Sequence, residues 1–294
     1  MSSIRKQRVL LLGSSGMVGR SIATMFAATP DVELLLTQRS DAAAPLYLDA
    51  ASTPPEIIRS LVASVAPNYI INCAGILNSR IIVGDSASLA TAMEVNGNFP
   101  HHLATAAEEC GAKVIHVSTD GVFSGQKKEP YLESDRTDAT DNYGRSKIAG
   151  ECGLSHVLNV RCSIIGRNPE SGRGLLEWLL SVPDGSEADG YFDQMWNGVT
   201  SKQLARLCLS LTQNDLFDAV RRDGHVVHFC PNPPISKYDL LCLWRDATGK
   251  DVIIQQRAKP ATVASRVLAS KHDSWRKAVE GVGNWPELLQ ECKE

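Results

Sequence analysis

The amino-terminal stretch 9–26 reads VLLLGSSGMVGRSIATMF, and it carries the signals that decide the fold. The apolar run at residues 9–12 ends at Gly13, a pattern typical of a strand covered on both faces in a parallel sheet. Apolar residues then recur at helical spacing, at Val18, Ile22, Met25 and Phe26. A strand, a glycine turn and a helix therefore follow one another, and together they predict the first βα unit of a parallel sheet.

The same alternation continues along the chain. It predicts further strands at residues 32–36, 69–73 and 113–117, and further helices at residues 55–65 and 99–110. Strands that alternate with helices of this length form βαβ units with right-handed crossovers. We therefore predict the α/β class, a doubly wound parallel sheet of the Rossmann type.

Composition restricts the possible partners. The chain has 294 residues, 43% of them apolar, which is enough for one large domain or two closely joined ones. Thirty Lys and Arg against thirty-three Asp and Glu leave a net charge of -3, so no basic surplus favours nucleic acid or an anionic membrane. The eight cysteines contain no C-x-x-C pair, and no apolar run approaches the roughly twenty residues of a membrane span. We expect a soluble cytoplasmic protein without a metal site.

Residues 13–19 form a G-x-x-G-x-x-G loop between the first predicted strand and helix. Glycines at these positions allow a tight turn and a close approach of the backbone to a pyrophosphate, whose charge then meets the helix N-terminus. A plain tight turn is the alternative, but the βα context favours a dinucleotide. The expected contacts in this loop are Gly13, Ser15, Gly16, Met17, Val18 and Gly19.

The end of the second strand decides between NAD and NADP, because a carboxylate there binds a free ribose 2′-hydroxyl and an Arg binds a 2′-phosphate. Residues 37–40 read TQRS, and the next carboxylate is Asp41. Arg39 therefore favours NADP, with NAD as the alternative; a solvated loop charge is the other interpretation of this arginine. Asp49 is expected to contact the adenine amine or to cap the next turn.

Beyond residue 165 the pattern becomes irregular, and Gly, Pro, Asp and Ser crowd residues 166–190. We expect an NAD(P)-binding domain at residues 1–165, to which part of 199–230 returns, and a smaller mixed α/β substrate-binding lobe at 166–294. Ser236, three residues before Asp239 and followed by an apolar stretch, predicts a helix start with a capping box.

Tyr143 and Lys147 stand four residues apart, which places both side chains on one face of a helix. Such a pair also arises by chance, so its position matters. It lies twenty-four residues after Thr119, which follows the strand at residues 113–117 at the sheet edge where open α/β folds bind ligands.

These three residues suit the reduction of a ketone. Hydride addition to carbon requires a proton on oxygen, and the phenol of Tyr143 can donate it. A neighbouring Lys147 ammonium favours phenolate and is expected to lower the pKa of Tyr143. Thr119 is expected to donate a hydrogen bond to the oxygen where negative charge develops.

Five segments together resemble the extended short-chain dehydrogenase/reductase superfamily and, more narrowly, its dTDP-4-dehydrorhamnose reductase branch. They are residues 13–19, 72–75 (NCAG), 95–100 (VNGNFP), 118–125 (STDGVFSG) and 143–151 (YGRSKIAGE). The likeness covers roughly residues 9–250, and 118–125 is its most specific part.

This resemblance implies an NAD(P)H-dependent reduction of the 4-keto group of a nucleotide-linked deoxysugar, in the service of polysaccharide biosynthesis. It implies that Tyr143 donates the proton, that Lys147 holds the nicotinamide ribose and that Thr119 contacts the sugar oxygen. Cys73, Ala74 and Gly75 would then line the cofactor cleft by their backbone. Asn96 matches an Asn of the family pattern, and a purely structural hydrogen bond is its alternative role.

The substrate side departs from that branch. Gly121 stands where the branch usually carries Tyr, and Ile164 stands where a Trp often enters the sugar pocket. Trp196 is expected either to stack on the substrate or to anchor the second lobe. Residues 259–260 and 266–268 match the branch only loosely, with Arg266 as a possible diphosphate contact. The sugar and its nucleotide therefore stay open.

Other functions compete with reduction. Gly121 follows Asp120 where related dehydratases carry Glu, which disfavours dehydration, whereas a nucleotide-sugar epimerase uses the same catalytic trio. The branch also resembles the regulatory beta subunit of methionine adenosyltransferase, a non-catalytic NADP-binding protein. His101 and His102 lack a partner at metal-ligand spacing. The oligomeric state stays open, a homodimer included.

Overall fold

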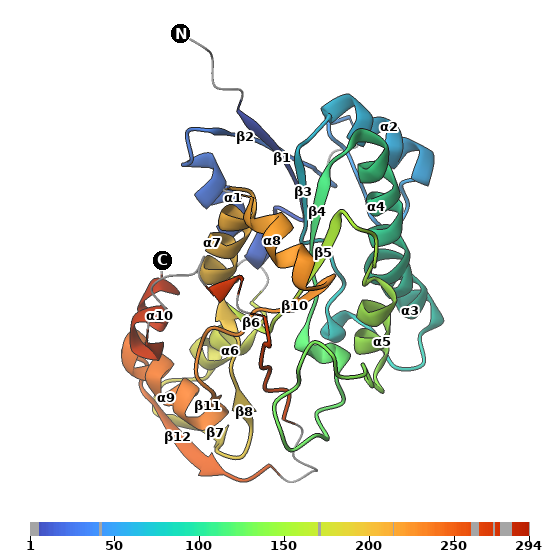
Figure 1. Cartoon of the computed structure of the whole chain (residues 1–294). Coiled ribbons are helices and arrows are strands. Elements are labelled where there is room, and N and C mark those ends of the chain that lie inside the picture. The colour runs from blue at the N-terminus through green and yellow to red at the C-terminus, as the bar shows by residue number, and fades with distance from the viewer. Residues whose placement is uncertain are drawn as a thin grey trace.

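A six-stranded parallel sheet forms the centre of the molecule, in the order β10-β5-β4-β3-β1-β2 (Figure 1). The computed structural model describes residues 6–40, 43–169, 172–213, 215–259, 265–272, 274–276 and 284–293. The sheet strands are β1 (Gln7–Leu12), β2 (Val32–Leu36), β3 (Tyr69–Asn72), β4 (Lys113–Val117), β5 (Val157–Arg161) and β10 (Val226–His228). All neighbouring pairs are parallel, which confirms the predicted α/β class.

The chain order of the strands reverses beside β1, since β2 lies on one side of it and β3 on the other. Open α/β sheets form a crevice at such a point, outside the carboxyl ends of the strands. A single parallel bridge from Gln38 to Tyr47 continues the sheet beyond β2. The fold therefore places the ligand crevice at the loop that follows β1.

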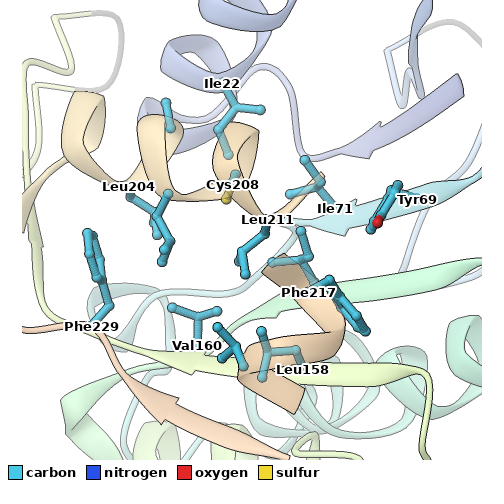
Figure 2. Close-up of a cluster of buried hydrophobic side chains, with 14 of the residues drawn as sticks. Ile22, Tyr69, Ile71, Leu158, Val160, Leu204, Cys208, Leu211, Phe217 and Phe229 are labelled. Atoms are coloured by element: carbon cyan, nitrogen blue, oxygen red, sulfur yellow. The ribbon is translucent and has the colours of Figure 1, made fainter. Parts of the chain in front are cut away.

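Helices cover both faces of the sheet, and alternate residues of β1 enter two separate cores. Val9 and Leu11 pack in one core with α1 (Met17–Ala27), α7 (Ser201–Leu211) and α8 (Leu216–Asp223), part of which is shown in Figure 2. Leu10 and Leu12 pack in the other core with α2 (Pro55–Val65) and α4 (Phe99–Cys110). This burial on both sides explains why residues 9–12 are uninterruptedly apolar.

Several further short elements lie between β3 and β5 in the chain. They are η1 (Asn78–Arg80), α3 (Ser86–Ala92), the π-helical turn η2 (Met93–Asn98), η3 (Asp120–Val122) and α5 (Asn142–Ala149). The predicted helices 55–65 and 99–110 and strands 32–36 and 113–117 have the observed bounds, and β3 ends one residue earlier than predicted.

A second group of elements has its own apolar core, which includes Trp244 of α9 (Lys237–Thr248). Its other helices are α6 (Leu175–Ser181) and α10 (Trp285–Glu291). Its short strand pairs are β7 (Ser186–Tyr191) with β12 (Val252–Arg257), β8 (Met195–Trp196) with β11 (Ile235–Ser236), and β6 (Ile164–Ile165) with β9 (Val199–Thr200). Three elements from the same half of the sequence belong to the main sheet instead: α7 and α8 pack against it, and β10 is its edge strand.

The predicted helix start at Ser236 is confirmed, because its hydroxyl oxygen accepts the Asp239 N–H at 3.0 Å. The predicted capping box is wrong at this position. In a capping box the side chain at Asp239 would accept the backbone N–H of Ser236. Here the Asp239 carboxylate accepts a hydrogen bond from the Ser236 hydroxyl at 2.6 Å instead. The reciprocal pair of bonds occurs instead at α7, between Thr200 and Gln203.

Within the described ranges, no helix has the length and apolar character needed to cross a bilayer. All eight cysteines are free thiols, four of them buried.

Candidate active site

The glycine loop packs tightly against its surroundings. Gly13 has a φ of +76°, and a Cβ added to it would lie 2.8 Å from the backbone nitrogen of Ala74. A Cβ on Gly19 would lie 2.1 Å from the carbonyl oxygen of Gly13. Gly16 is the N-cap of α1 and makes no side-chain cap hydrogen bond. No side chain of the N-cap residue thus occupies the start of the helix, which suits a phosphate there.

A cleft of about 740 Å³ opens beside this loop. Its wall contains every predicted cofactor contact outside the catalytic trio: Gly13, Ser15, Gly16, Met17, Val18, Gly19, Arg39, Asp49, Cys73, Ala74 and Gly75. These residues follow the carboxyl ends of β1, β2 and β3, which the parallel sheet brings to one edge.

Three arginines lie in the cleft wall: Arg39 after β2, Arg80 in η1 and Arg173 before α6. All three residues are exposed, and their charges suit an anionic group in the cleft. Arg80 was not predicted, because a single charge in a loop carries no sequence signal. Asp49 also lines the cleft, and its carboxylate accepts the Ala51 N–H at 3.0 Å, so it caps the following turn. Asp41 lies outside the described residues.

A smaller chamber of about 280 Å³ shares a wall with this cleft and brings together Thr119, Tyr143 and Lys147. Thr119 follows β4, whereas Tyr143 and Lys147 lie on α5. Asp141 starts that helix by accepting the Gly144 N–H at 2.7 Å. Because the helix begins there, Tyr143 and Lys147 are one turn apart and both reach the chamber.

The predicted lowering of the Tyr143 pKa is wrong for this structure. Burial raises the pKa of Tyr143 to about 12, and the Thr119 hydroxyl only partly opposes this rise. Lys147 is itself 4% exposed, and burial lowers its pKa to about 8. Its Nζ donates to the carbonyl oxygen of Val117 at 2.9 Å. The phenol of Tyr143 is therefore neutral over the physiological range and keeps the proton that a donor needs.

A buried ion pair supports this chamber from behind. Arg161 contacts the Glu151 carboxylate through Nε at 2.7 Å and Nη2 at 2.6 Å, and both side chains are less than a tenth exposed. The Ser118 hydroxyl donates to the same carboxylate at 2.7 Å. The pair thereby fixes the backbone next to Thr119, since a bidentate contact allows little rotation.

The substrate side combines residues of both halves of the chain. Ile164 lies in the wall of the cleft and of the chamber, and Trp196 lies in the wall of the cleft. Lys237 joins them, with Nζ 4.5 Å from the centre of the Trp196 ring. Burial lowers the pKa of Lys237 to about 8, against the attraction of Asp120. Lys237 was not predicted as a site residue, because a lysine at a helix start is usually solvated.

Two other predicted residues have structural partners. Arg266 lies 3.5 Å from Asp141 and is not part of the described cleft wall. Pro260, next to Lys259, lies outside the described residues. Asn96 donates to Ser146 Oγ at 3.0 Å and binds the backbone of Ile76 through both amide atoms, which ties α5 to the loop after β3.

The two adjacent histidines at the start of α4 show no ligand geometry. His101 Nε2 contacts the carbonyl oxygen of Ala149 at 2.7 Å. Across the part of the chain that the structure describes, no three His, Cys, Asp or Glu side chains are grouped to hold a metal ion.

Comparison with known proteins gives consistent relatives. The dTDP-4-dehydrorhamnose reductase of Aggregatibacter actinomycetemcomitans is 29% identical over 254 residues, which cover 84% of this chain and 81% of the relative. Methionine adenosyltransferase 2 subunit beta of Danio rerio is 27% identical over 251 residues, 82% of this chain and 74% of the relative.

The fold is also that of solved structures. The dTDP-4-dehydrorhamnose reductase of Bacillus anthracis in complex with NADP superimposes with a TM-score of 0.79 at 19% identity, covering 98% of this chain and 99% of that chain. The family described as the RmlD substrate binding domain matches residues 7–275. Because this match spans most of the sequence, the chain belongs to the RmlD substrate binding domain family.

Proposed function

We propose that this protein is an NADPH-dependent oxidoreductase that reduces the 4-keto group of a nucleotide-linked deoxysugar. One observation carries the proposal: Thr119, Tyr143 and Lys147 line a single chamber that opens from the glycine-loop cleft. Relatives named dTDP-4-dehydrorhamnose reductase support the choice of substrate class. A dTDP-linked sugar is therefore the first substrate to test.

The cleft suits a dinucleotide phosphate. The uncapped start of α1 and the backbone of residues 13–19 would hold the pyrophosphate. Arg39 and Arg80 would hold a 2′-phosphate, which supports NADPH over NADH, with NADH as a usable alternative. When bound, the cofactor supplies the hydride.

The residues of the chamber manage the proton. Tyr143 holds its proton at neutral pH because burial raises its pKa to about 12, so it is a donor to the sugar oxygen. Thr119 is 8% exposed, and its hydroxyl lies in the same chamber, where it would stabilise developing negative charge on that oxygen. Lys147 would hold the nicotinamide ribose and return a proton to the phenolate.

Incubation with a dTDP-4-keto-6-deoxy sugar, followed by NADPH absorbance, tests the proposal. We expect Tyr143→Phe to lower turnover by about 10²–10⁴-fold, the usual contribution of a general acid, and to leave NADPH affinity nearly intact. A wild-type protein that binds NADPH but turns over no sugar in a panel of such substrates would refute it.

The likeness to methionine adenosyltransferase 2 subunit beta supports a second candidate, a cofactor-binding subunit without its own turnover. Recovery of one stoichiometric partner enzyme from a pull-down, together with no reductase turnover, would favour this candidate. An epimerase that uses this trio would instead interconvert two epimers of a nucleotide sugar without net consumption of NADPH.

A further inference from the structure

Two buried side chains, Asn72 and His116, extend from the sheet to the catalytic lysine, and their hydrogen bonds have a defined direction. Asn72 Oδ1 accepts the Ala74 N–H at 3.1 Å, so its amide nitrogen must be the atom that faces His116. That nitrogen lies 3.1 Å from His116 Nδ1. An amide nitrogen only donates, and therefore His116 Nδ1 must accept and carries no proton.

The other ring nitrogen of His116 then holds the proton. His116 is 1% exposed, and burial, followed by the charges of Lys147 and His101, lowers its pKa well below the ordinary value. The ring is thus neutral, with a single proton on Nε2. Nε2 lies 3.4 Å from Lys147 Nζ, so this N–H is directed at the catalytic amine.

This arrangement suits an uncharged lysine. An ammonium group has three hydrogens and no lone pair, so it cannot accept the Nε2–H of His116. An uncharged amine can accept it and still donate to the Val117 carbonyl oxygen at 2.9 Å. Both bonds of Lys147 are satisfied only in the uncharged form.

The other ionisable groups around Lys147 divide into two kinds. Glu151, at the end of α5, is a carboxylate and favours the ammonium. Cys73 and Cys162, from the loops after β3 and β5, face the amine as thiols, because burial raises the pKa of both. Burial of Lys147 itself outweighs the attraction of Glu151. His116 is thus the neighbour whose hydrogen bond distinguishes the two protonation states of Lys147.

We propose that His116 is a positioning residue for the catalytic lysine: fixed by Asn72 with its proton on Nε2, it disfavours the ammonium form of Lys147 and so eases the release of a proton from this side chain. This proposal rests on the proposed function for the role of Lys147. When Tyr143 gives its proton to the sugar oxygen, a phenolate is left. The Lys147 ammonium passes one proton to that phenolate, which restores the phenol, and the resulting amine takes a proton from water and leaves a hydroxide ion in the solvent.

Nitrogen NMR of the cofactor-free protein labelled with ¹⁵N-histidine tests the tautomer directly. We expect His116 to be neutral at pH 7 with its proton on Nε2. A charged ring or a proton on Nδ1 would overturn the proposal. This measurement needs neither a variant nor a substrate.

The second measurement follows the titration of Lys147 in protein labelled with ¹³C-lysine, assigned with Lys147→Arg. In His116→Gln the amide oxygen can turn toward an ammonium, so the titration midpoint should rise by about one pH unit, the effect of one hydrogen bond specific to a protonation state. His156→Gln is the control, because the His156 ring contacts the carbonyl oxygen of Ala104 and is not among the groups that act on Lys147. Equal midpoints in His116→Gln and wild type would show a packing role only.

The two proposals fail separately. A protein with no reductase turnover but the expected tautomer and midpoint shift would refute the proposed function alone. If the protein is a working reductase, but His116→Gln changes neither the titration midpoint of Lys147 nor the pH profile of turnover, the inference alone is refuted. If His116→Gln does not fold, the tautomer in the wild-type protein still decides.

Discussion

Gly19→Ala tests whether close packing of the glycine loop, rather than flexibility, holds the cofactor cradle in shape. The added Cβ would lie 2.1 Å from the Gly13 carbonyl oxygen and 2.7 Å from two further backbone atoms of Gly13 and Ser14. Ordinary contacts between carbon atoms are about 3.5–4.0 Å, so the loop must move by more than an ångström. Overpacking of this kind costs about 1–3 kcal/mol, and none of the atoms involved belongs to a flexible side chain.

Thermal unfolding and NADPH titration measure the two consequences. Each kcal/mol lowers the melting temperature of a domain this large by about 2–4 °C, so a cost of about 1–3 kcal/mol gives an expected loss of roughly 2–12 °C. NADPH affinity should also fall, because the displaced N–H groups no longer converge on the pyrophosphate. Gly153→Ala is the control, since a Cβ there meets nothing within 4 Å. If Gly19→Ala and the wild type have the same melting temperature and the same NADPH affinity, the shape of the cradle does not depend on the close packing of Gly19 against Gly13.

Three further variants test the cofactor choice, the buried amine and the ion pair. Arg39→Ala should weaken NADPH binding by about tenfold or more, the value of a charge-assisted hydrogen bond, and leave NADH binding nearly unchanged; equal losses for both cofactors would remove Arg39 from the 2′-phosphate site. The pKa of Lys147 is about 8 in the folded protein and 10.5 for an ordinary lysine. Between these two pH values the unfolded chain binds more protons at this residue than the folded chain does. The free energy of unfolding of the wild type therefore rises with pH in this range through Lys147. The stability of Lys147→Met relative to wild type should therefore fall as the pH increases from 8 to 10.5, as urea unfolding at several pH values will show. Glu151→Gln leaves Arg161 buried without its charge partner and should cost about 3–5 kcal/mol. Asp189→Asn removes the carboxylate of the exposed pair with Arg257 and should cost under about 1 kcal/mol. Similar losses of stability in Glu151→Gln and Asp189→Asn would contradict this reasoning.

Local patterns were sufficient to predict four of the six strands of the main sheet, β1 to β4. The helix Phe99–Cys110 has Pro100 in its first turn and ends before Gly111, whose φ of +72° suits a helix C-terminus. Residues 9–12 are buried on both faces, so their apolar run carries the strand signal without help from distant segments. The glycine loop then follows from the order of strand and helix. In such segments, the pattern of apolar residues, glycines and prolines along the chain is enough to predict the helix or strand that packs in the folded protein.

The second lobe was less predictable, because its strands depend on distant partners. Residues Ser186–Tyr191 read SEADGY, without apolar alternation, and they form a strand by pairing in parallel with Val252–Arg257. Ordinary periodicity cannot reveal such a pairing. Lys237 was missed for the same reason. Its place in the wall of the cleft depends on how α9 packs, and a lysine near a helix start is otherwise a solvated residue.

The substrate-side differences from the dTDP-4-dehydrorhamnose reductase branch affect sugar recognition more than proton transfer. Gly121 lies against the chamber: a Cβ there would be 3.2 Å from Tyr143 Cε1 and 3.3 Å from Thr119 Oγ1. If the proposed function is correct, glycine at 121 and Ile164 in place of a Trp would leave less aromatic surface toward the sugar, and Trp196 would supply such a surface from the second lobe. Burying the Lys237 ammonium is costly, and a phosphorylated or hydroxylated ligand in the cleft would supply oxygen acceptors for it. The residues proposed for proton transfer thus keep the pattern of the branch, whereas the residues proposed for the sugar differ from it.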